Sequence, residues 1–124
     1  MKLSLLLSLM LFSGQSLPND QKIKQLMNSY LKSLHHYDTK LLKKISTPRY
    51  YQEMSPKLKS KSTKHLGEFK PYTFDLQIKK ALETPNMFFV KIKDKKKNKF
   101  GDYAYIIIKQ DRSFVIDSIF FEEE

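Results

Sequence analysis

The chain has 124 residues, no cysteine, and 23 lysine and arginine residues against 13 aspartate and glutamate residues, which gives a formal net charge of +10. The absence of cysteine excludes a disulfide framework, a thiolate nucleophile and a cysteine for lipid attachment. The length is enough for one modest hydrophobic core and too short for two, so we expect a single domain. A chain this basic is attracted to anionic surfaces or acidic partners.

The N-terminus has the organisation of a secretory signal peptide. A lysine precedes an apolar run over residues 3–12, and the small residues Gly14 and Ser16 stand at the positions that signal peptidase recognises. The apolar run is much shorter than the ~20 residues that span a bilayer. We therefore expect residues 1–16 to be cleaved, no transmembrane segment to remain, and the domain of residues 17–124 to be exported to a bacterial periplasm or exterior.

Helical periodicity marks the first half of the mature chain. Within residues 20–36, apolar side chains form a single stripe opposite lysines and other polar residues, which predicts an amphipathic helix. A shorter helix is predicted next, with Asp38 or Thr39 as its N-cap and an apolar face within residues 41–45.

A third short helix is predicted after a break in the chain. Thr47 suits its N-cap and Pro48 its first position, where the missing N–H of proline costs nothing. Ser55 and Pro56 are expected to end this helix. Residues 57–70 are rich in lysine and weakly periodic, which indicates either a loop or a loosely packed helical segment.

From residue 72 onward the hydrophobic period changes to two, which is typical of strands. We expect four strands, at residues 72–79 with Leu82 in the same phase, 87–93, 100–109 and 113–121. The last two are apolar on both faces, with Phe114, Ile116 and Phe120 on one face of the fourth strand, so we expect both to be central and covered on both sides.

Helices followed by a meander of strands predict an α+β fold. In it, the helices of residues 20–55 pack on one face of a curved four-stranded antiparallel sheet formed by residues 72–121.

The order of elements resembles the nuclear transport factor 2-like (cystatin-like α+β) superfamily. The resemblance covers most of residues 19–121 and rests on a long first helix, short helices around the Leu-Leu-Lys-Lys-Ile run of residues 41–45, and a last strand that reads Arg-Ser-Phe-Val-Ile-Asp-Ser-Ile at residues 112–119. The chain departs from the superfamily pattern at residues 111–112, which replace a glycine in the final turn, and at Phe114, which replaces a tryptophan. A strand between the second and third helices is not evident.

The resemblance implies a cone-shaped half-barrel with a pocket between helix and sheet, and often dimerisation through the sheet. It implies no single activity, because such scaffolds serve enzymes, ligand binders and interaction modules. In isomerase-like members a carboxylate base acts against hydroxyl donors that stabilise an enolate. Candidate residues for such a pocket are Tyr30, Asp38, Tyr103, Tyr105 and Asp117.

These pocket candidates have a structural alternative. Tyrosines that alternate along a strand commonly pack in the core or at its rim, and Asp117 would then face solvent or a neighbouring lysine. Because the family's catalytic constellation has no residue-by-residue match here, we assign no catalytic residue and favour a non-enzymatic role.

The segment from His35 to Asp38 is the densest cluster of polar side chains. Adjacent helical histidines point about 100° apart and cannot both reach one ion. We therefore interpret the segment as a helix end, in which a histidine faces backbone carbonyls and Asp38 caps the next helix. No metal or other cofactor is predicted.

Two lysine runs are the strongest compositional feature. Candidates for contact with an anionic surface are Lys91, Lys93, Lys95, Lys96, Lys97 and Lys99. The other run is Lys57, Lys59, Lys61 and Lys64. The first run lies at a turn beside Phe89 and Phe100, and it fits either an anion-binding patch or a solvated turn that discourages aggregation at a sheet edge.

The expected function is that of an exported, non-enzymatic interaction module of a bacterial envelope, which forms a homodimer through the sheet or binds another protein. The alternatives are a small-molecule binder or isomerase-like enzyme, a basic adaptor for anionic lipids or glycans, and a neutralising partner of an envelope-acting toxin. Export argues against nucleic acid as a partner.

Overall fold

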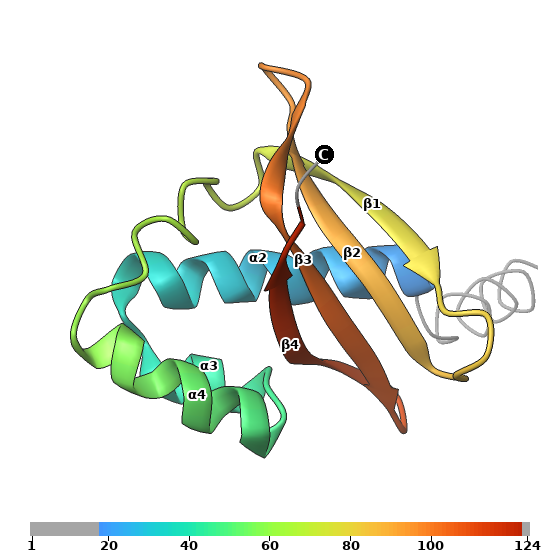
Figure 1. Ribbon diagram of the computed structural model, residues 1–124, viewed down its shortest axis with the longest axis horizontal. Coiled ribbons are helices and arrows are strands. Elements are labelled where there is room, and N and C mark those ends of the chain that lie inside the picture. Colours follow the sequence, from blue (N-terminus) through green and yellow to red (C-terminus); the bar gives the residue numbers. More distant parts are fainter. Residues whose placement is uncertain (1–17, 123–124) are drawn as a thin grey trace, which may run out of the picture.

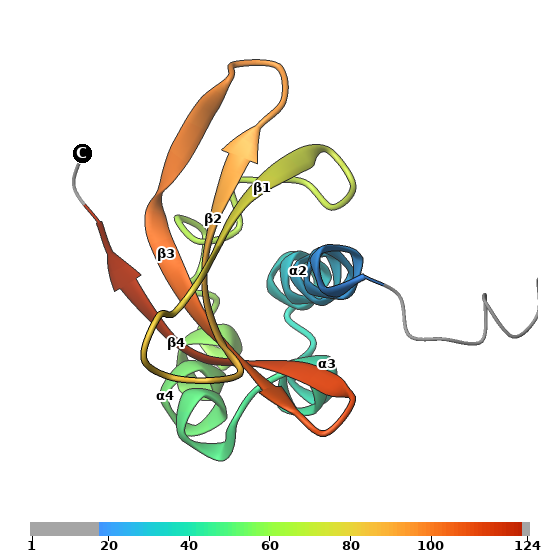
Figure 2. The ribbon, with the colours of Figure 1, turned by 90° about the vertical axis from the view of Figure 1, so that its right-hand side faces the viewer.

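The computed structural model describes residues 18–122, which form helices followed by strands (Figure 1). The helices are α2 (Asn19–His36), α3 (Thr39–Lys44) and α4 (Pro48–Lys59), and the strands are β1 (Phe74–Lys80), β2 (Met87–Asp94), β3 (Lys99–Gln110) and β4 (Ser113–Phe121). The strands form one antiparallel sheet in the order β1-β2-β3-β4, which is curved and not closed (Figure 2). The predicted α+β class, with helices before a four-stranded antiparallel meander, is confirmed.

Helix α2 lies along the concave face of the sheet (Figure 2). Its apolar stripe is buried, as the periodicity predicted; the stripe consists of Ile23, Leu26, Met27, Tyr30, Leu31 and Leu34. These side chains share one core with strand residues that point to the same side, among them Val90, Tyr105, Ile107 and Ile116. The helix ends at Tyr37, which adopts a left-handed conformation with φ of 53°.

The N-caps of the two short helices follow the predicted chemistry. The Asp38 carboxylate accepts a hydrogen bond from the Leu41 N–H at 3.0 Å, so Asp38 rather than Thr39 caps α3. The Thr47 hydroxyl oxygen accepts one from the Tyr50 N–H at 3.3 Å, and Pro48 takes the first position of α4.

The predicted end of the third helix is wrong, because α4 continues past Ser55 and Pro56 to Lys59. Proline inside a helix removes one backbone hydrogen bond. The continuation buries Leu58 completely in the core beside Met54, which offsets that loss. Packing between distant parts of the chain therefore overrides the local signal.

The predicted start of the first strand is also wrong, since β1 begins at Phe74. Tyr72 adopts a left-handed conformation with φ of 66°, which a strand cannot contain. Its N–H donates to the side-chain oxygen of Asn28 at 2.8 Å, and its hydroxyl accepts from Lys32. Leu82, in phase with the strand, lies beyond its end and is fully exposed.

The fourth strand is not central, contrary to expectation, because β4 forms an edge of the sheet. Part of this edge is covered by the linker between α3 and α4. The Ile116 N–H donates to the Ile45 carbonyl at 2.8 Å, and the Thr47 N–H donates to the Ile116 carbonyl at 2.9 Å. Ser46, between α3 and α4, thus forms a short parallel bridge with Ile116. No strand was evident from the sequence at this place.

A β-bulge changes the phase of β4. Ile116 pairs with Ile107 and Ser118 with Ile106, so Asp117 is an extra residue on β4. A strict period of two would place Phe120 on the face of Ile116, but the bulge turns Phe120 to the opposite face. The predicted grouping of those two residues is therefore wrong.

The predicted signal peptide, residues 1–16, lies outside the described part of the chain. Between residues 18 and 122, the structure contains no helix that combines the length and the hydropathy needed to span a membrane.

Candidate functional sites

Three tyrosines from different elements meet in the interior. Tyr30 of α2, Tyr50 of α4 and Tyr105 of β3 are all buried. The hydroxyl oxygens of Tyr30 and Tyr50 are 3.0 Å apart and share a hydrogen bond. The rings of Tyr30 and Tyr105 meet edge to face, with their centroids 5.1 Å apart. We call these residues the tyrosine cluster.

Burial sets the chemistry of the tyrosine cluster. Desolvation raises the pKa of Tyr30, Tyr50 and Tyr105 well above the usual value for tyrosine, and the neighbouring hydroxyls add to the effect. All three therefore stay protonated near neutral pH. They can donate hydrogen bonds, but they cannot act as bases there.

The pocket candidates from the sequence do not all converge. Tyr30 and Tyr105 lie together, and Tyr103 packs at the rim against His65 and Phe121, with ring centroids 5.7 Å away in each case. The cavity that Tyr103 and Tyr105 line has a volume of about 10 Å³, which leaves room for one water molecule at most.

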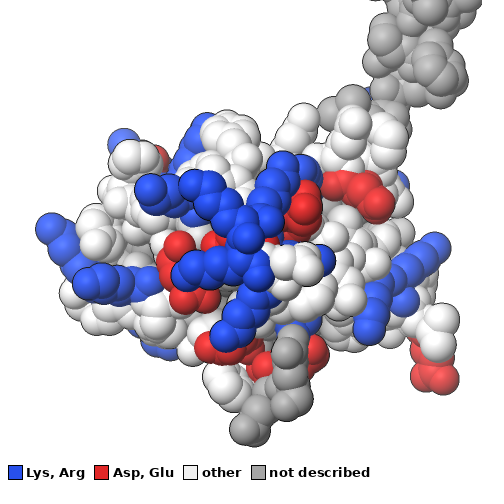
Figure 3. Space-filling view, turned by 90° about the horizontal axis from the view of Figure 1, so that it is seen from above, with Lys and Arg blue, Asp and Glu red and all other residues white. Residues whose placement is uncertain are grey.

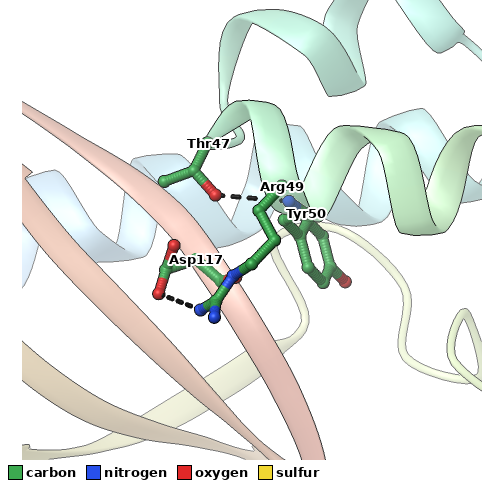
Figure 4. A network of polar contacts seen from close by, with 4 residues as sticks. All are labelled: Thr47, Arg49, Tyr50 and Asp117. Atoms are coloured by element: carbon green, nitrogen blue, oxygen red, sulfur yellow. Dashed lines mark hydrogen bonds and ion pairs between the residues drawn. The ribbon is translucent and has the colours of Figure 1, made fainter.

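The two carboxylates of the candidate set have other partners. Asp38 caps α3. Asp117 forms an ion pair with Arg49, whose guanidinium reaches across from the first turn of α4 (Figure 4). Figure 4 also shows Tyr50, the next residue, on the same turn as Arg49, with Thr47 capping that turn. The expected neighbour of Asp117 was solvent or a lysine, and the structure supplies an arginine instead.

The segment from His35 to Asp38 is a helix end, as interpreted from the sequence. The Nε2 atom of His35 is hydrogen-bonded to the Phe69 carbonyl at 2.9 Å, which ties the loop of residues 60–73 to the end of α2. We expected a histidine here to face the carbonyls at the end of its own helix, but the carbonyl that His35 contacts belongs to the loop. Asp38 turns toward α3, so the two side chains serve different neighbours.

The lysines of the β2–β3 hairpin stand among carboxylates. Lys91 is almost buried, and its ammonium is 3.0 Å from the Glu122 carboxylate. Lys95 is 3.9 Å from the carboxylate of Asp75. The ammonium groups of Lys91 and Lys93 both lie over the Phe100 ring, 5.6 Å and 5.5 Å from its centroid.

The tip of this hairpin is organised by Asp94. Its carboxylate accepts hydrogen bonds from the N–H groups of Lys97 and Lys96, at 3.0 Å and 2.8 Å, and these bonds hold the pKa of Asp94 below its usual value. A hollow of about 240 Å³ beside the tip is lined by Lys97 and Lys99 together with Glu68, Asp94 and Asp102. Figure 3, which looks onto this end of the molecule, shows blue and red side chains interleaved.

The outer face of the sheet, opposite α2, presents an apolar surface. The register places Phe89 beside Ile106, and Met87 in one row with Ile108 and Val115. Phe89 is 36% exposed, and Phe120 on the same face is 37% exposed. Figure 1 views the sheet from this side, and none of the helices of residues 18–122 lies in front of it.

Comparison of the chain with family models, with curated proteins and with solved structures gave no match. Sequence reasoning missed Tyr50 as a member of the tyrosine cluster, because its helix is distant in the chain from Tyr30 and Tyr105.

Proposed function

We propose that the chain is an exported, non-enzymatic interaction module of a bacterial envelope, with a half-barrel of the nuclear transport factor 2-like kind, and that it forms a homodimer through the outer face of its sheet. The observation that carries this proposal is the apolar outer face. Its members are Met87, Phe89, Ile106, Ile108 and Phe120, with the buried Val115 beside them.

Contiguous apolar surface of this kind is unfavourable in water and commonly marks an interface. A second copy is the partner that we favour. In a twofold dimer the same surface is used by both subunits, so it must complement itself. An apolar surface can meet this condition, because apolar side chains pack against copies of themselves without any matching of charge.

The arrangement of side chains in the interior argues against catalysis there. The tyrosine cluster fills the space that a pocket would use, and its raised pKa values keep the hydroxyls neutral. Asp38 and Asp117 are engaged elsewhere, so no carboxylate of the candidate set faces these hydroxyls. A proton-abstracting enzyme needs a base close to its hydroxyl donors.

Light scattering after size exclusion tests the dimer. We expect the chain to run as a dimer, and the variant Ile106→Glu to run as a monomer with an unchanged far-ultraviolet circular dichroism spectrum. The matched control is Gln25→Glu, which adds the same charge at an exposed position of α2, on the other side of the sheet. A wild-type monomer at micromolar concentration would contradict the proposal.

A further inference from the structure

The helices α3 and α4 and the turn after them carry a second basic surface. Residues 40–64 contain seven lysines, and every one is exposed; they are Lys40, Lys43, Lys44, Lys57, Lys59, Lys61 and Lys64. We call this set the helical lysine surface. Glu53 is the only acidic residue of residues 40–64, and Arg49 is occupied by Asp117. Among the ion pairs within residues 18–122, none includes a lysine of this surface.

The lysines come together because the two helices pack side by side (Figure 1). The ammonium of Lys43 on α3 lies 5.9 Å from the ring centroid of Tyr51 on α4. At the other end, the ammonium of Lys61 lies 5.2 Å from the ring centroid of Tyr37, which precedes α3. Lysines from both segments therefore gather at the same end of the molecule, where α3 and α4 lie (Figure 1).

We propose that the helical lysine surface docks on an anionic phospholipid membrane. Lysine offers a compact point charge without the bidentate geometry with which arginine recognises a single phosphate. Clustered lysines therefore suit an array of many mobile headgroups, and polybasic segments are attracted to anionic leaflets in this way. Because the apolar side chains of both helices face the core, the attachment is electrostatic and does not require insertion.

The shape of the surface favours a membrane over a polymer held in a groove. The nearest hollow, of about 340 Å³, is lined by Tyr37, Lys64 and Glu68 among others. It contains one lysine of the surface and also a carboxylate, so it does not concentrate positive charge. Five of the remaining lysines project from exposed positions on α3 and α4, and Lys61 projects from the turn after α4.

This inference goes beyond the proposed dimer and does not depend on it. The helical lysine surface lies beside the β4 edge, whereas the proposed dimer uses the outer face of the sheet (Figure 1). A dimer would present two copies of the surface and bind more tightly through avidity. A monomer would still bind, with lower affinity.

Vesicle co-sedimentation of the full chain tests the inference. The vesicles contain phosphatidylglycerol and phosphatidylcholine in equal parts, with pure phosphatidylcholine as the neutral control. The variant K40Q/K43Q/K44Q removes three charges from α3, and the matched control K95Q/K96Q/K97Q removes three from the β2–β3 hairpin. All variants keep the same N-terminus, and melting curves confirm that each is folded.

We expect binding to the anionic vesicles that weakens with salt, and a loss of at least about tenfold in affinity for the α3 variant. The hairpin variant should lose less than about threefold, because Lys95 lies near the Asp75 carboxylate and the Asp94 carboxylate lies at the tip beside Lys96 and Lys97. A second variant, K57Q/K59Q/K61Q, should reproduce the α3 result. Equal losses for the α3 variant and the hairpin variant, absence of binding at low salt, or binding only to a soluble acidic polysaccharide such as alginate would overturn the inference.

Discussion

Two lysine-rich regions of the molecule, the β2–β3 hairpin and the α3–α4 pair, differ in what surrounds their charges. In the hairpin, Glu122 and Asp75 face lysines directly, and Asp94 organises the tip. In the helical pair, the lysines stand on exposed positions with Glu53 as the only acidic residue among them. A run of lysines in the sequence therefore shows only that the segment is rich in positive charge. The electric field that a partner experiences depends on which carboxylates the fold places next to those lysines.

The largest effect is expected when the helical pair is detached from the core. Leu42 is the only buried residue of α3. We expect Leu42→Ala to lower the free energy of unfolding by about 2–5 kcal/mol, because it removes buried methyl groups and leaves a cavity. Urea denaturation measures the loss. Lys96→Ala, on the exposed hairpin tip, serves as the control and should stay within about 0.5 kcal/mol of the wild type.

The base of the hairpin can be tested through Gly101 on β3. A Cβ atom at this position would lie 2.7 Å from Cε2 of Phe69, so a side chain there forces the ring to move. We expect Gly101→Ala to cost about 1–3 kcal/mol of stability through overpacking. The matched control is Gly67→Ala, whose Cβ would meet Leu34 at an ordinary 3.4 Å. Equal melting temperatures for the two variants would contradict the expected clash.

The start of α3 offers an intermediate effect. Asp38→Ala removes the carboxylate that accepts the Leu41 N–H, and such caps contribute about 1 kcal/mol. Asp38→Asn retains an acceptor oxygen and should recover most of the stability. Thermal melts of the two variants separate the loss of the cap from the loss of a negative charge. If both variants were equally destabilised, the charge would be the cause.

The smallest expected effect concerns single lysines of the two lysine-rich regions. Lys91→Gln should lower stability by about 0.5–1 kcal/mol, because it removes the partner of Glu122, whereas Lys43→Gln should change it by less than about 0.5 kcal/mol. A double-mutant cycle with Glu122→Gln isolates the pair and should show a coupling that declines with salt. A coupling of zero would mean that the hairpin pair makes no contribution to folding.

Local signals in the sequence were enough to predict the order of elements and the N-caps of the two short helices, α3 and α4. Thr47, Pro48 and Asp38 act through neighbours within a few positions, and their side chains do what their chemistry predicts. The period of two likewise identified the strands, because alternate residues along each strand face the core.

Features that depend on distant contacts could not be predicted. The continuation of α4 through Pro56 depends on the burial of Leu58, and the edge position of β4 depends on strand order. The partner of Asp117 is 68 residues away in the chain, and that of Lys91 lies at the C-terminal end of the described residues. For the candidate sites, the sequence therefore identified tyrosines and lysines of interest, but it gave no information on which of them meet a carboxylate.

The tyrosine cluster gives the molecule an optical signature. The chain has no tryptophan, so its near-ultraviolet circular dichroism comes mainly from tyrosine, and Tyr30, Tyr50 and Tyr105 are held in fixed, asymmetric surroundings. Fixed aromatic packing produces this signal, and a compact state that has lost its packing no longer shows it. The near-ultraviolet spectrum can therefore show whether the interior of a variant is still packed after its surface lysines have been replaced.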